Sequence, residues 1–121
     1  MQLGELKFSV LLFGLLQTLR VMARRHPAYA KRLAERNLTA QIRTADNKVA
    51  RHFTFRDGRV TSGRGIHPSA DITVTVQNAD LGVKLFSLRV DHLERIEAIK
   101  NFQLQAEGPD ELMVWFMQTL G

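Results

Sequence analysis

Strict alternation of apolar and polar residues is the feature of this chain that most constrains its fold. A period of two is typical of a β-strand with one buried face and one solvated face. LTAQIRTA from Leu38, DITVTVQ from Asp71 and FQLQAE from Phe102 all show this period. These segments predict a sheet with one wet face, so all helices must cover the other face. In the last segment, Phe102, Leu104 and Ala106 are expected to point inward.

A tight hairpin is predicted at Asp57-Gly58. Two-residue hairpin turns need positive φ angles, which the Asp-Gly pair adopts at low cost. The segment before the turn, VARHFTFR, alternates so that Phe53 and Phe55 share a face with Arg51. The segment after the turn, RVTSG, is expected to form the next strand.

Two helices are predicted ahead of these strands. Pro27 disfavours the helical conformation at His26, so the first helix should stop near Arg25. A short second helix, AYAKRLAERN, follows and should end on Asn37 in a left-handed cap.

The second half of the chain predicts three more helices and a strand. ADLGVKLFSL has helical spacing through Leu85 and Leu88. DHLERIEAIK opens with a capping box, in which Asp91 is the N-cap and Glu94 lies three residues on. The last helix follows Gly108. The expected fold class is therefore α+β with two layers, in which helices cover one face of a five-stranded, mostly antiparallel sheet.

The most apolar stretch, FSVLLFGLLQTLRVMARR, runs from Phe8 to Arg25. Its apolar run ends at Leu16, which is short of the ~20 residues that a membrane span needs. Glu5 and the absence of a small-residue cleavage pattern argue against a signal peptide. One stripe at helical spacing predicts packing on the sheet. It consists of Phe8, Leu11, Leu12, Leu15, Leu19 and Met22.

A second apolar group lies away from that stripe on the same helix: Leu6, Val10, Phe13 and Val21. A helix that is apolar on nearly all sides is either deeply buried or touches something besides its own core. Three interpretations therefore stay open: a buried helix, a helix that faces lipid, and a helix that docks a partner or a second copy of the chain.

Positive charge is concentrated in the same segment of a chain whose net charge is +5. Residues 1–36 hold seven Lys and Arg against Glu5 and Glu35, whereas the charges of residues 37–121 cancel. An anionic partner, such as a membrane surface, should therefore meet the N-terminal end. The residues expected to contact a membrane or a partner are Val10, Phe13, Arg20, Arg24 and Arg25.

Motifs for catalysis and metal binding are not found in the sequence. Cysteine is absent, the four histidines are not paired at helical ligand spacing, and no serine lies in G-x-S-x-G. Basic residues are not interleaved with exposed aromatic residues, which argues against a nucleic-acid partner. We expect no enzyme, no cofactor and no metal site. The lack of cysteine fits a cytoplasmic location, including the periphery of the inner membrane.

The order of elements from ADITVTVQNADLGVKLF through FQLQAEGPDELMVWFMQTL resembles the sterol carrier protein type two family. The resemblance covers residues 28–121, and residues 1–26 form an additional basic, apolar helix, so that 1–121 is one lipid-binding domain. Two features depart from the family pattern. Asn101 stands where a glycine is common before the last strand, and SLRVDH lacks the usual Gly- and Pro-containing loop.

The resemblance implies an apolar cavity between sheet and helices that holds a sterol, a fatty acyl chain or a polyprenyl-quinone type of lipid. Some single-domain members resemble accessory factors of ubiquinone biosynthesis, which present such a lipid to a lipid-modifying enzyme complex. The alternative is an interaction module or homo-oligomer that uses the N-terminal helix and carries no lipid. The expected lipid-binding residues are Phe53, Phe55, Val74, Leu81, Leu85, Ile96, Trp115 and Phe116.

Overall fold

A computed structural model describes residues 3–86 and 92–120 and contains the elements in the predicted order. The helices are α1 (Leu3–Arg25), α2 (Pro27–Ala34), α3 (Ala79–Phe86), α4 (His92–Lys100) and α5 (Asp110–Leu120). The strands are β1 (Leu38–Thr44), β2 (Ala50–Arg56), β3 (Arg59–Arg64), β4 (Ile72–Val76) and β5 (Leu104–Glu107).

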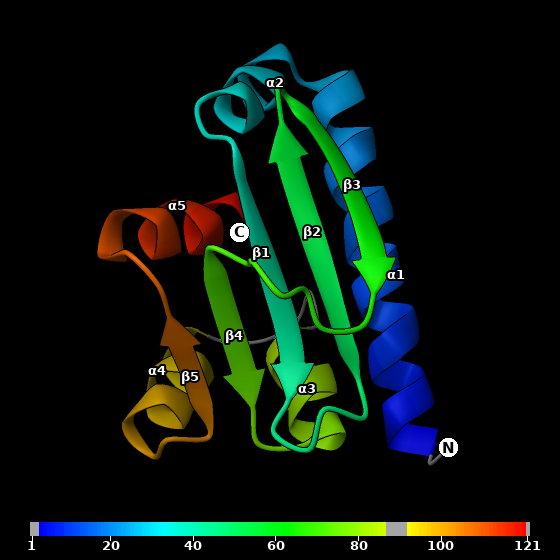
Figure 1. Ribbon diagram of the computed structural model, residues 1–121, viewed down its shortest axis with the longest axis vertical. Helices are drawn as coiled ribbons and strands as arrows, with labels where there is room; N and C mark the ends of the chain where they lie inside the picture. Colours follow the sequence, from blue (N-terminus) through cyan, green and yellow to red (C-terminus); the bar gives the residue numbers. More distant parts are fainter. Residues whose placement is uncertain (1–2, 87–91, 121) are drawn as a thin grey trace.

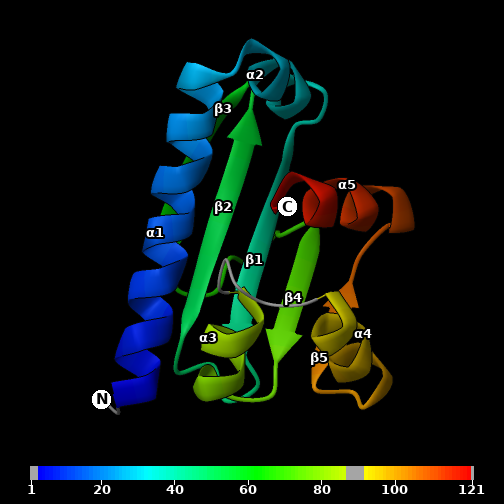
Figure 2. The ribbon, with the colours of Figure 1, turned by 180° about the vertical axis from the view of Figure 1, so that it is seen from behind.

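One mixed sheet, with strand order β3-β2-β1-β4-β5, forms the first layer. β1 and β4 pair in parallel, and the other neighbours are antiparallel. The segment between β3 and β4 crosses the outer face of β2 and β1 (Figure 1), where the His67 N–H donates to Gln41 Oε1 at 2.9 Å. Seen from behind, α1, α3, α4 and α5 all lie on the opposite face (Figure 2), which confirms the predicted two-layer α+β fold.

The β2–β3 hairpin forms as predicted. Asp57 and Gly58 have φ angles of 52° and 80°, and Arg56 pairs with Arg59 across the turn. These positive angles match the right-handed twist of the strands, which is why Asp-Gly suits the turn.

The predicted stripe of α1 packs on the domain except at its C-terminal end, where Met22 is exposed. Phe8, Leu12 and Leu16 are buried beneath the helix, and α1 lies beside α3. A Cβ added to Gly82 would lie 2.6 Å from Cζ of Phe8, so the two helices can approach this closely only because Gly82 has no side chain.

The expectation that this segment is too short for a membrane span was wrong about its length. α1 has 23 residues and, by length and composition alone, could cross a bilayer, a test that a core helix with buried Phe8 and Leu12 also meets. The uninterrupted apolar run ends at Leu16, but the apolar surface of the helix is longer than this run. Leu3 and Leu6 extend it before the run, and Val21 extends it after the run.

Three local predictions need correction, and two lie outside the described residues. α2 ends at Ala34, and the φ of Asn37 is not positive; its side chain instead accepts the Asp57 N–H at 2.9 Å. Phe102 does not point inward: it is 78% exposed, in a turn with φ of 59° ahead of β5. Ala106 is exposed because β5 is a short edge strand.

The predicted positions of Leu88 and the capping residue Asp91 fall within 87–91, outside the described residues.

Candidate functional site

Most of the predicted lipid-binding residues lie in the packed interior. Six of the eight are buried in one apolar cluster, which Leu81 borders: Phe53, Phe55, Val74, Leu85, Trp115 and Phe116. Phe55 meets the rings of Trp115 and Phe116 edge-on, with centroids 5.3 and 6.0 Å apart. The side chains of this cluster fill space against one another. Ile96 is separate from it, on an exposed side of α4.

The indole of Trp115 is buried, yet its Nε1 has no hydrogen-bond partner among the described residues. The guanidinium of Arg32 lies over the ring, 5.9 Å from its centroid. An indole N–H normally finds a partner when it is buried. Trp115 is therefore held by aromatic and cationic contacts instead of by its own donor.

An open apolar pocket of about 450 Å³ lies where β4 and β5 meet α4 and α5. This volume falls within the usual range for small-molecule sites. Among the eight predicted lipid-binding residues, only Val74 lines it. Most of its wall is apolar, and the principal side chains are Val74, Ile99, Phe102, Leu104 and Met117.

Beside this pocket lies an exposed apolar edge, which we call the α4 edge; it is made of Leu93, Ile96 and Ile99 of α4 and of Phe102 in the turn that follows the helix. Within α4 the small side chain of Ala98 is buried, whereas the large apolar side chains of Leu93, Ile96 and Ile99 are exposed to solvent. Sequence reasoning missed the pocket because it placed Phe102 in a strand. The spacing of Leu93, Ile96 and Ile99 at every third residue was the signal that could have indicated an apolar face.

The second apolar group on α1 is exposed, as its position away from the stripe suggested. Leu6, Val10, Phe13 and Val21 are all at least 42% exposed. Arg24 and Arg25 are exposed as well. Arg20 is half-buried because its Nε donates to the carbonyl of Val60 at 3.1 Å.

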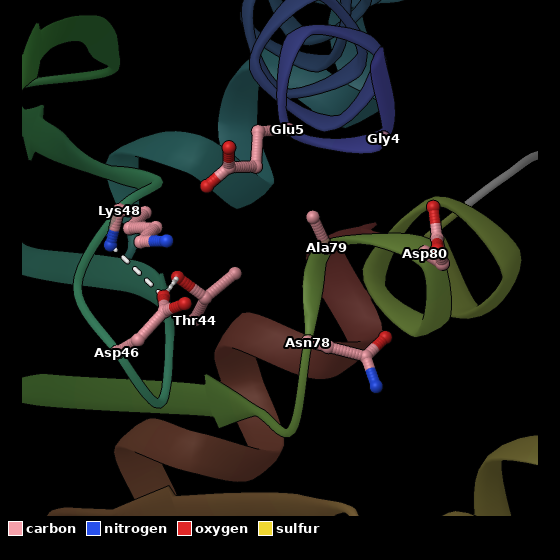
Figure 3. Close-up of a pocket in the computed structure, with 8 residues that line it drawn as sticks. All are labelled: Gly4, Glu5, Thr44, Asp46, Lys48, Asn78, Ala79 and Asp80. Atoms are coloured by element: carbon pink, nitrogen blue, oxygen red, sulfur yellow. Dashed lines mark hydrogen bonds between the residues drawn. The ribbon is translucent and has the colours of Figure 1, made fainter. Parts of the chain in front are cut away.

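A small polar pocket of about 160 Å³ lies between the start of α1, the β1–β2 turn and the start of α3 (Figure 3). Glu5 extends from α1 toward this turn, and its side chain is largely buried. Hydrogen bonds from Thr44 Oγ1 (2.7 Å) and the Lys48 N–H (3.0 Å) hold the pKa of the Asp46 carboxyl below its ordinary value. No group of three His, Asp or Glu residues in the described part of the chain is placed to hold a metal ion.

Solved structures of sterol carrier proteins share this architecture. A ubiquinone synthesis protein, UbiJ-SCP2, matches with a TM-score of 0.62 and 19% identity over 88% of this chain and 90% of its own. Sterol carrier protein 2 like 2 from Aedes aegypti matches with a TM-score of 0.54 and 14% identity, over 90% and 95% of the two chains. The same Aedes aegypti protein has been solved in palmitated form, and there the TM-score is 0.50 at 20% identity, over 71% and 74%.

The same fold also occurs as a small part of a larger enzyme. The sec-alkylsulfatase Pisa1 from Pseudomonas sp. matches with a TM-score of 0.54 and 22% identity over 76% of this chain, which spans only 14% of the sulfatase. No family model and no curated protein matches the sequence. At these identities the structural matches define the architecture alone, and the chain has the fold of the sterol carrier proteins, as its sequence predicted.

Proposed function

We propose that this protein binds an apolar lipid in the pocket between β4, β5, α4 and α5, and carries or presents it without altering it chemically. The observation that carries the proposal is an apolar pocket left open beside the exposed α4 edge. A contiguous exposed apolar surface on a folded protein commonly marks a site that binds a ligand, a partner or a membrane. The proposal gains support from the palmitated Aedes aegypti protein, which has the same fold.

The pocket is suited to a flexible chain more than to a polar ligand. Met117 at its wall is unbranched and can adapt to ligands of different girth. A lipid tail longer than the pocket would extend from Val74 and Met117 along the exposed α4 edge, because Leu85 and Phe116 are packed in the interior. A polyprenyl-quinone is one such lipid, and the UbiJ-SCP2 ubiquinone synthesis protein supports a place for this chain beside lipid-modifying enzymes.

Loading takes place at a membrane surface in this proposal. Val10 and Phe13 are exposed on α1, and Arg24 and Arg25 follow at its end. Each exposed arginine near an anionic surface contributes about 1 kcal/mol, whereas Arg20 contributes less because it is tied to Val60. The domain is then a single unit, residues 1–121, that contacts the cytoplasmic face of the inner membrane from one side.

Lipid uptake by the double variant Ile99→Asp/Phe102→Asp tests the pocket. Both side chains are exposed, so the fold should survive the change. A carboxylate in the pocket wall is costly beside an acyl chain, and we expect at least tenfold weaker uptake of a fluorescent fatty acid. Ile66→Asp is the matched control, since Ile66 is 47% exposed but lies outside the pocket. Equal uptake by all three proteins, or no uptake by the parent chain, would contradict the proposal.

A second candidate function is self-association or partner docking through α1 without lipid cargo. The exposure of Leu6, Val10, Phe13 and Val21 favours it. Light scattering on the Val10→Glu/Phe13→Glu variant separates the two functions. A change in oligomeric state, with no lipid uptake by either protein, would favour this second function. A monomeric parent chain that takes up lipid would exclude self-association.

A further inference from the structure

Two pairs of arginines face each other across the β2–β3 hairpin. Arg56 lies opposite Arg59 next to the turn, and Arg51 lies opposite Arg64 at the far end. Like charges directly opposite each other destabilise an antiparallel pair. Arg56 and Arg59 are both exposed on the outer face, where solvent screens them.

The pair at the far end is on the face that α1 covers in part, where Arg51 is half-buried and Arg64 is exposed. Since side chains alternate along a strand, Arg51 shares the face of Phe53, which is buried. Arg51 donates to Ser62 Oγ at 2.8 Å, and its guanidinium lies 5.5 Å from the Phe13 ring centroid. These contacts hold the guanidinium in place between the sheet and α1. Burial, with the charge of Arg64, lowers the pKa of Arg51 from its ordinary value.

An inward charge on an edge strand has a structural use, because it discourages edge-to-edge aggregation. That use accounts for Arg64 on the edge strand β3. It does not account for Arg51, because β2 is paired on both sides. A second positive charge opposite the first needs a different explanation.

The two arginines line a pocket of about 270 Å³ between α1 and the ends of β2 and β3. Lys48 contributes a third positive charge, and Leu6 and Leu12 contribute apolar wall from α1. No carboxylate lines this pocket in the described part of the chain. The nearby carboxylates of Glu5 and Asp46 line the adjoining polar pocket, which shares Lys48, and are not part of this wall.

We propose that this pocket binds the phosphate head group of a lipid within an anionic bilayer, through Lys48, Arg51 and Arg64. Guanidinium groups match phosphate geometry with paired hydrogen bonds. A bilayer, and not a free phosphate, is the expected source because exposed Leu6, Val10 and Phe13 continue the same side of α1. The inference rests on the membrane contact proposed above and gives that contact a specific head-group site.

The test compares two double variants on one hairpin. Arg51→Gln/Arg64→Gln removes the pocket pair, and Arg56→Gln/Arg59→Gln removes the same charge from the outer face. Binding is measured by co-sedimentation with phosphatidylcholine vesicles, with and without phosphatidylglycerol. We expect the pocket variant to lose about tenfold or more on the anionic vesicles, and the control to lose less than about threefold. Equal losses would mean that only total charge matters, and would overturn the proposal.

The sources of phosphate are separated by competition with soluble glycerol phosphate. We expect it to compete weakly, because it lacks the apolar neighbour that meets α1. Two results together would show that the bilayer is not the source of the phosphate. These are tight binding of glycerol phosphate, and equal vesicle binding by the parent chain and the pocket variant. If the glutamine pair does not fold, Lys48→Gln on the exposed turn carries the same test, with Lys100→Gln as its control.

Failure of this site and failure of the lipid-carrier proposal give different results. The pocket variant should take up fluorescent fatty acid delivered from solution as the parent chain does, because the pocket at α4 is separate. No uptake by any protein would contradict the carrier function alone, whereas unchanged vesicle binding by the pocket variant would contradict the head-group site alone.

Discussion

The two ends of the helical layer cover the sheet in opposite ways. Under α1, Phe8 and Leu12 are completely buried, and Phe53 opposite them is 1% exposed. At the other end, Ile99 of α4 is 53% exposed beside an open pocket. Tight packing stabilises a fold but leaves no room for a ligand. We therefore expect burial under α1 to provide most of the stability, and we propose that the carried lipid binds at the α4 end, apart from the polar head-group pocket beside α1.

The largest expected effect is a loss of stability when the packing under α1 is disrupted. Phe8→Ala removes a fully buried ring and should lower the free energy of unfolding by about 3–5 kcal/mol, through lost burial and a residual cavity. Phe13→Ala on the exposed side of the same helix is the control, and should cost less than about 1 kcal/mol. Urea unfolding measures both. Similar values for the two variants would mean that α1 is not part of the core.

A change at the α4 end should act in the opposite direction. Phe102 holds a left-handed φ of 59°, which costs a residue with a side chain about 1 kcal/mol. Phe102→Gly should therefore raise the free energy of unfolding by up to about 1 kcal/mol, while it weakens lipid uptake. Urea unfolding and fatty-acid titration are run on the same sample. Lower stability with intact uptake would show that Phe102 serves the fold and not the ligand.

A smaller effect is expected where the packed interior contains a polar atom without a partner. Trp115→Phe keeps the aromatic contact with Phe55 and removes the unpaired indole N–H. Loss of packing area and loss of a buried unsatisfied donor oppose each other, so the free energy of unfolding should change by less than about 1 kcal/mol. Thermal unfolding checks this. A large loss of stability would indicate that Nε1 has a partner in solution.

The smallest effect concerns pH at the β1–β2 turn. The folded pKa of Asp46 is lowered, first by the hydrogen bond from Thr44. A lowered folded pKa stabilises the protein above the unfolded pKa, and this contribution is lost as pH falls through the folded pKa. Thr44→Val should raise the pKa of Asp46 toward its ordinary value, as followed by NMR titration. An unchanged pKa would assign the effect to the Lys48 N–H instead.

The sequence predicted those features that local chemistry determines. Strand alternation identified the strands and the inward-facing Leu104, and Asp57-Gly58 identified the hairpin. The parallel pairing of β1 with β4 depends on contacts between distant segments, which no local pattern contains. Phe102 was misplaced because its apolar character fits a strand, whereas its left-handed backbone turns it outward.

The candidate site was harder to predict for a related reason. Residues with strong core character, such as Phe55 and Phe116, were expected to line a cavity, but in the structure they contact each other. An apolar residue in a sequence can fill space or line it, and only the position of neighbouring helices decides which. The spacing along α4 gave no information about how little of that helix the sheet would cover.

Photo-crosslinking with a diazirine-labelled fatty acid, followed by mass spectrometry of the crosslinked peptides, tests the central claim most directly. The account predicts crosslinks at the open pocket, on Ile99, Phe102, Leu104 and Met117, which saturate as the lipid concentration rises. Crosslinks confined to the α1 side of the sheet, at Phe8, Leu12 or Phe53, or crosslinks that never saturate, would contradict it.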